Sequence, residues 1–78
     1  MQAVKVLNSL IKTYKSIREF ARVIDEDAAD ITRWKSGKRL PHARAVVSII
    51  KHHPTVKPHD LNPDVFEKGL TFNFNGDK

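Results

Sequence analysis

The sequence contains no cysteine, only three glycines and one tryptophan, and no long run of apolar residues. Without cysteine the chain has no disulfide, no thiol nucleophile and no zinc–thiolate site, which fits a reducing compartment, so we expect a cytoplasmic protein. Without an apolar run of about 20 residues, no segment can cross a membrane as a helix. A chain of 78 residues forms one domain with a small core, too small for a deep substrate cleft.

Positive charge is concentrated in the first two thirds of the chain. The sequence holds 14 lysines and arginines against 9 acids, a net charge of +5. Residues 1–54 carry 11 of the basic and 5 of the acidic side chains, whereas residues 55–78 carry 3 and 4. A basic body of this kind favours a polyanionic partner, and a solvated surface is the alternative that charge alone leaves open.

Apolar residues recur at helical spacing in four segments, so we expect a mostly α bundle of four to five short helices. The first predicted helix covers about residues 3–13. The second begins at Ser16, which forms a capping box with Glu19. The third begins at Asp27, a good N-cap, and ends at Gly37, a left-handed terminator.

The fourth predicted helix has Pro41 in its first turn and stops at Pro54. A proline-punctuated tail follows, in which Asp60 or Asn62 can cap one short turn. Residues 70–75 then alternate apolar and polar side chains, which is the pattern of a short strand.

We treat residues 67–78 as a C-terminal tail, either strand-like or disordered. Its apolar positions are Leu70, Phe72 and Phe74. Three interpretations stay open: contact with a second copy of the chain in a dimer, a strand added to another protein, or a disordered tail.

Two short helices joined by a tight turn, residues 16–24 and 27–35, define a helix-turn-helix hypothesis. At helical spacing Ile31 and Trp34 face the core, which leaves a stripe of the second helix facing outward. The residues on this stripe, which we assign to reading DNA bases, are Ala28, Ala29, Thr32 and Arg33. A helix fits the major groove, where an arginine can pair with guanine; a solvated helix face is the alternative.

Cations gather directly after this second helix. Residues 35–39 combine three cations, a hydroxyl and a glycine, a composition suited to holding phosphates; a polar loop with solvated charges is the alternative. The residues assigned to phosphate contact are Lys35, Ser36, Lys38, Arg39 and, one turn into the next helix, Arg44.

Two runs of residues carry a family resemblance: Phe20-Ala21-Arg22 and Ile31-Thr32-Arg33-Trp34-Lys35-Ser36-Gly37-Lys38-Arg39-Leu40-Pro41. They are similar to the Cro and repressor family of phage helix-turn-helix proteins, and most similar to the Cro-like branch that includes the YdaS-type prophage regulators. A segment like residues 60–66 is also frequent in that branch, so the resemblance covers about residues 17–66.

The resemblance implies a lambda-repressor-like, Cro-like helix-turn-helix DNA-binding domain over residues 1–66. It also implies a transcriptional regulator, often a repressor, that acts on a near-palindromic operator as a homodimer formed before or on the DNA. By position in the family pattern, phosphate contact falls in addition on Ser16 and Ile17.

The sequence departs from the family pattern in the turn of the motif. Asp25 stands where the family has glycine, and Glu26 stands where it has an apolar residue. With Asp27 and Asp30 they make the entry to the second motif helix acidic, which repels phosphate.

Other functions have less support from the residues. Four histidines lack a His-x-x-x-His pair and cysteine partners, so we expect no metal and no other cofactor. No serine has an oriented base nearby and no glycine-rich phosphate loop exists, so we expect no enzyme and no small-molecule substrate. The competing class is a protein-interaction module, antitoxin-like or an adaptor, that offers its helical body to a partner.

Overall fold

The computed structural model describes residues 2–72 and consists there of five helices without a strand. This confirms the mostly α bundle predicted from the apolar spacing. In chain order the helices are α1 (Gln2–Ile11), α2 (Ile17–Ile24), α3 (Ala28–Lys35), α4 (Ala43–His52) and α5 (Pro58–Leu61).

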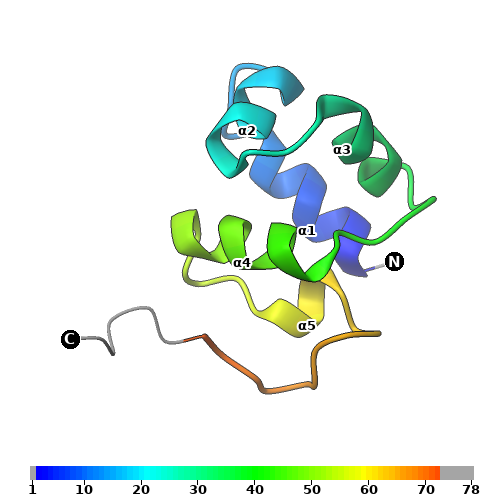
Figure 1. Ribbon diagram of the computed structural model, residues 1–78, viewed down its shortest axis with the longest axis vertical. Helices are drawn as coiled ribbons and strands as arrows, with labels where there is room; N and C mark the ends of the chain where they lie inside the picture. Colours follow the sequence, from blue (N-terminus) through cyan, green and yellow to red (C-terminus); the bar gives the residue numbers. More distant parts are fainter. Residues whose placement is uncertain (1, 73–78) are drawn as a thin grey trace.

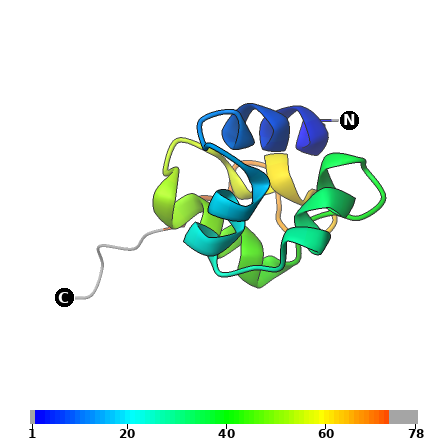
Figure 2. The ribbon, with the colours of Figure 1, turned by 90° about the horizontal axis from the view of Figure 1, so that it is seen from above.

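Helices α2 and α3 lie together at one end of the bundle, and α4 and α5 lie at the other (Figure 1). Helix α1 runs along one side and packs against both α3 and α5 (Figure 2). Helix α4 packs against α2 and α5, so the two ends enclose one apolar core. Its buried residues are Leu7, Ile11, Phe20, Ala21, Ile24, Ile31, Trp34, Ala45, Val46, Ile49, Ile50 and Leu61.

The start of α2 is fixed by the side chain of Ser16. Its Oγ accepts a hydrogen bond from the Glu19 amide at 3.1 Å, as the sequence predicted. The reciprocal half of the capping box is shifted by one residue, because the Glu19 carboxylate accepts from the amide of Lys15 at 2.8 Å. Two backbone donors at the helix start are satisfied in this way.

Helix α4 begins later than the sequence predicted. Pro41 is not in its first turn; it lies in the preceding loop, where it is buried and its carbonyl accepts a 2.7 Å hydrogen bond from the Asn62 side-chain amide. The N-cap is His42, whose Nδ1 accepts from the Ala45 amide at 3.2 Å. With Pro41 in the first turn the cap would fall on Leu40, which has no side-chain acceptor, whereas His42 has one.

The C-terminal segment folds back on its own chain over the described residues. The rings of Phe66 and Phe72 meet edge to face at 5.4 Å, and both are partly buried against the core. Residues 70–72 are not a strand, and Phe72 contacts Phe66 of its own chain. The assignment of Phe72 to a dimer contact stays a prediction. Leu70 stays 39% exposed, and Phe74 lies outside the described residues.

Candidate nucleic-acid interface

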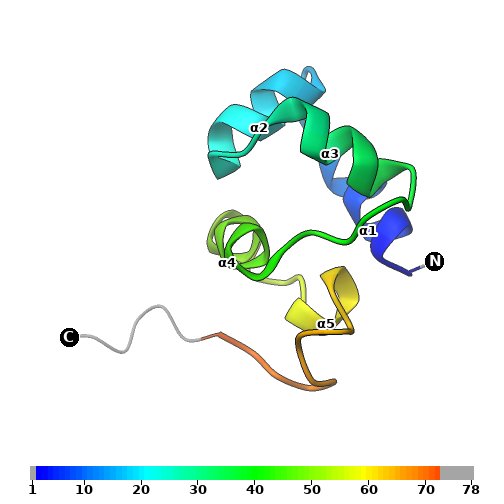
Figure 3. The ribbon, with the colours of Figure 1, turned by 45° about the vertical axis from the view of Figure 1, so that its right-hand side comes forward.

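Helices α2 and α3 are neighbours joined by a three-residue turn, as a helix-turn-helix requires (Figure 3). Asp25 takes the left-handed conformation there, with φ 60° and ψ 51°, and the amide of Glu26 donates to the Ala21 carbonyl at 2.9 Å. Aspartate tolerates this region better than most residues, so the turn forms without the glycine of the family pattern.

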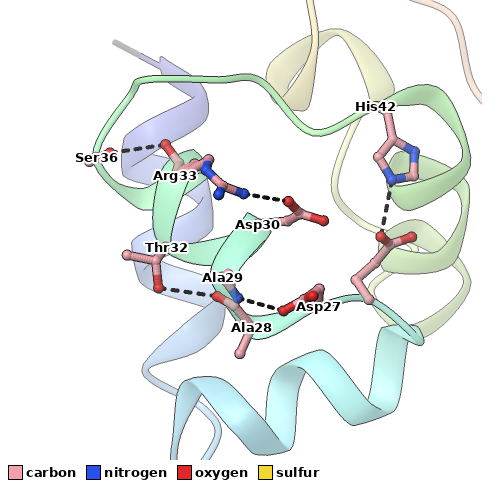
Figure 4. A network of polar contacts seen from close by, with 9 residues as sticks. Asp27, Ala28, Ala29, Asp30, Thr32, Arg33, Ser36 and His42 are labelled. Carbon is pink, nitrogen blue, oxygen red and sulfur yellow. Dashed lines mark hydrogen bonds and ion pairs between the residues drawn. The ribbon is translucent and has the colours of Figure 1, made fainter.

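Glu26, which has no role that the sequence explains, is held by the N-cap of α4. Its side chain is only 9% exposed, and its Oε1 lies 3.0 Å from Nε2 of His42 (Figure 4). Because Nδ1 of His42 accepts from the Ala45 amide, the ring proton sits on Nε2 and is donated to the carboxylate. The pair ties the motif turn to α4, and it keeps this carboxylate from being displayed to solvent.

The outward face of α3 is set by its two buried residues, Ile31 and Trp34. Ala29, Thr32 and Arg33 are exposed on the opposite side, as the sequence predicted. Ala28 lies at the border, because it is half-buried and packs against the core. Three of the four base-reading candidates are therefore open to a ligand, and Ala28 lies at the edge of this exposed face.

The two hydroxyl groups on this side of α3 are bonded to the helix itself. Thr32 donates its hydroxyl to the Ala28 carbonyl at 3.1 Å, and Ser36 donates to the Arg33 carbonyl at 3.0 Å (Figure 4). Thr32 consequently offers a methyl group and an acceptor oxygen. Ser36 can donate to a phosphate only by giving up its bond to the helix.

Arg33 does not extend straight into solvent. Its Nη1 lies 2.8 Å from Oδ1 of Asp30, one turn earlier in α3, and the two side chains are 50% and 42% exposed (Figure 4). From the sequence, Asp30 was expected only to add negative charge at the entry to this helix. The spacing of three residues between opposite charges was the signal that predicts this pair.

The loop after α3 can contact a ligand through its positively charged side chains but less through its backbone amides. Its amides are used to close the helix: Ser36 and Lys38, for example, donate to the carbonyls of Thr32 and Arg33. Gly37 supports this turn with φ 82°, which confirms it as the left-handed terminator. Lys38 and Arg39 are exposed, and neither forms an ion pair within residues 2–72.

The four remaining candidates for phosphate contact lie at the ends of helices. Lys35 is half-buried at the end of α3, whereas Arg44 is exposed at the start of α4. Ser16 is exposed, and its oxygen already accepts from the Glu19 amide, so its own proton remains available. The amide of Ile17 belongs to the first turn of α2, where a helix offers no acceptor of its own.

The histidines are placed individually rather than as a group. His42 bonds Glu26, His53 bonds Tyr14, and Nδ1 of His59 lies 3.1 Å from the carbonyl oxygen of Phe66. Across residues 2–72 no three His, Cys, Asp or Glu side chains come together in a way that would hold a metal ion.

Tyr14 and His53 connect the α1–α2 loop to the end of α4. The Tyr14 hydroxyl lies 2.7 Å from Nε2 of His53. Burial, followed by the charge of Glu19, raises the pKa of Tyr14, so the phenol keeps its proton and donates it. Burial, followed by the charge of His52, lowers the pKa of His53, so the ring accepts in its neutral form.

This pair makes folding stability sensitive to acid. The pKa of His53 is lower in the folded chain than the usual histidine value of 6.5, so as the pH falls the unfolded chain takes up the proton first. The stabilisation is complete above the unfolded pKa and declines as the pH falls toward the folded pKa. Urea unfolding between about pH 8 and about pH 5 should show this loss. His53→Gln should flatten the dependence, whereas His52→Gln, at an exposed neighbour, should leave most of it; an equal effect of both would contradict the assignment.

Comparison of the chain with protein-family models, curated proteins and solved structures gave no match. The resemblance to the Cro and repressor family accordingly stays a prediction from the residues that carry it. In the described part of the chain, none of the helices has the length and apolar character needed to cross a bilayer.

Proposed function

We propose that this chain binds double-stranded DNA sequence-specifically, as a regulator of transcription, with α3 in the major groove. The observation that carries the proposal is the exposed face of α3, with Thr32 and Arg33, placed directly before the exposed cations Lys38 and Arg39. Base edges are read by such a helix face, and phosphates are bound by such cations.

Each side chain has a distinct task in this proposal. Arg33 donates to the acceptors of a guanine, and Thr32 and Ala29 contact a thymine methyl group. Lys38 and Arg39 neutralise phosphates on one side of the groove, and the first turn of α2 with Ser16 meets the backbone on the other.

A homodimer and repression belong to the same proposal. Two copies related by a two-fold axis would place their α3 helices about 34 Å apart, one turn of DNA, on a near-palindromic operator. Bound there, the dimer would exclude polymerase from a promoter in the cytoplasm. Leu70 is the exposed candidate for contact between the copies.

The proposal is tested by selecting bound duplexes from a random pool with the full chain at two salt concentrations. A sequence-specific binder enriches one motif, and the enrichment survives the higher salt. Binding at low salt without an enriched motif would identify a general polyanion binder, and absence of binding would leave no DNA function; either result would overturn the proposal.

Lys38→Ala should weaken binding to specific and unrelated duplexes alike. Loss of one phosphate contact should lower the slope of log K against log salt by about one. Titrations at several salt concentrations by fluorescence anisotropy measure this slope. The matched control is Lys57→Ala, an exposed lysine just before α5, at the other end of the bundle from α2 and α3. An equal loss of slope in both variants would remove Lys38 from the interface.

The protein-interaction module is the second candidate, and two exposed apolar side chains of the C-terminal segment favour it. Val65 is 57% and Leu70 is 39% exposed. This alternative predicts that the random pool yields no enriched duplex while Val65→Ser with Leu70→Ser weakens self-association or partner binding in sedimentation experiments.

A further inference from the structure

We propose that Asp30 is a positioning residue that makes Arg33 selective for guanine. This inference rests on the proposed DNA-binding function and extends it to a residue that the motif does not assign. It starts from the 2.8 Å contact between Oδ1 of Asp30 and Nη1 of Arg33 on the open side of α3.

The contact uses only one edge of the guanidinium group. Nη1 carries the bond to Asp30, and across residues 2–72 neither Nε nor Nη2 of Arg33 has a partner. Nε and Nη2 present two parallel N–H donors, which match the O6 and N7 acceptors of guanine in the major groove. The arrangement therefore leaves intact one of the edges through which a guanidinium can make a two-bond contact with guanine.

Asp30 also restricts where this edge points. A free arginine side chain samples many rotamers and loses that freedom when it binds a base. The bond to Asp30 fixes the guanidinium beside α3 before DNA arrives, so less freedom is lost on contact with the correct base. Half of the Arg33 side chain remains exposed, so the pair does not bury the group.

The alternative is that Asp30 masks Arg33 and merely weakens DNA binding. Masking of the whole guanidinium would also engage Nε and Nη2, whereas Asp30 contacts Nη1 alone. The two roles also predict opposite changes in selectivity. Removal of the carboxylate lowers repulsion of phosphates in either case, but only the positioning role makes selectivity fall.

The test compares Asp30→Ala with Asp25→Asn in the full chain. Both remove one negative charge at the entry to α3, and asparagine also tolerates the left-handed conformation of residue 25. Fluorescence anisotropy would measure binding to the selected duplex, to an unrelated duplex, and to duplexes altered at the base pair that Arg33 reads. That base pair is the one whose substitution changes binding of the unchanged chain but not of Arg33→Ala. Circular dichroism would establish that each variant is folded.

Asp30→Ala should bind the unrelated duplex more tightly than the unchanged chain and lose about fivefold to tenfold of the guanine preference. Asp25→Asn should gain the same general affinity and keep the preference. Asp30→Asn, which retains an oxygen acceptor without the charge, should fall between the two. It also decides the question if Asp30→Ala does not fold, because its preference must still lie below that of Asp25→Asn.

Two results would overturn the inference, and they are distinguishable. If the unchanged chain prefers guanine through Arg33 but Asp30→Ala keeps or increases that preference, Asp30 is not a positioning residue while the proposed function stands. If the unchanged chain shows no base preference, the proposed function fails, and the inference fails with it.

Discussion

Trp34→Ala should lower the free energy of unfolding by about 3–5 kcal/mol, the range found for large aromatic side chains removed from cores. Trp34 is 3% exposed at the end of α3, within the apolar core that α3 shares with α1, α2 and α4. Its ring also meets the ring of His42 edge to face at 6.1 Å, which joins α3 to the cap of α4. Domains of this size have only about 5 kcal/mol of stability, so up to about half of the Trp34→Ala molecules should be unfolded even without denaturant.

Urea unfolding followed by circular dichroism measures this effect, since the only tryptophan is lost in the variant. Trp34→Phe is the matched control, because it keeps an aromatic ring and should lose less than half as much stability. A variant Trp34→Ala with normal stability and lost DNA binding would instead identify Trp34 as a surface group that stacks on bases.

Arg33→Ala should weaken binding to the selected duplex by about 1–3 kcal/mol and remove the preference at a single base pair. The physical reason is loss of a two-bond contact with guanine, since Arg33 is exposed and only its Nη1 is engaged, by Asp30. Binding to unrelated duplexes should change much less, because those duplexes give the guanidinium no paired acceptors.

Arg33→Lys serves as the charge-matched control. Lysine keeps the positive charge but presents a single ammonium group instead of a planar fork, so the preference should be lost while general affinity is kept. Equal losses on every duplex for Arg33→Ala, restored by lysine, would place Arg33 among the phosphate contacts instead.

Features that depend on one turn of chain were predictable from the residues. Ser16 and Asp27 cap their helices, and Gly37 takes the left-handed conformation, because each acts on amides or carbonyls only a few positions away. The burial of Ile31 and Trp34 followed from helical spacing, and with it the exposure of the opposite face of α3.

Contacts between distant positions escaped prediction. Pro41 was expected in the first turn of α4, but it is drawn into the loop by the buried Asn62, and His42 takes over the cap. The alternation of residues 70–75 favoured a strand, yet residues 70–72 are not one, and Phe72 packs on Phe66. An alternating pattern predicts which side chains would lie on the same face of a strand, but it does not identify the residues that pack against that face.

The residues alone were enough to predict four helices and the open face of α3, because caps and apolar spacing act through backbone geometry within a few residues. The surroundings of the charges on and near that face depend on how the helices pack. Glu26 is covered because folding brings His42 to it across 16 positions. Arg33 has an open two-donor edge because packing leaves that side of α3 clear while Asp30 holds the other nitrogen. Charge in a sequence is a property of single residues, whereas its availability to a ligand depends on what the fold places beside it.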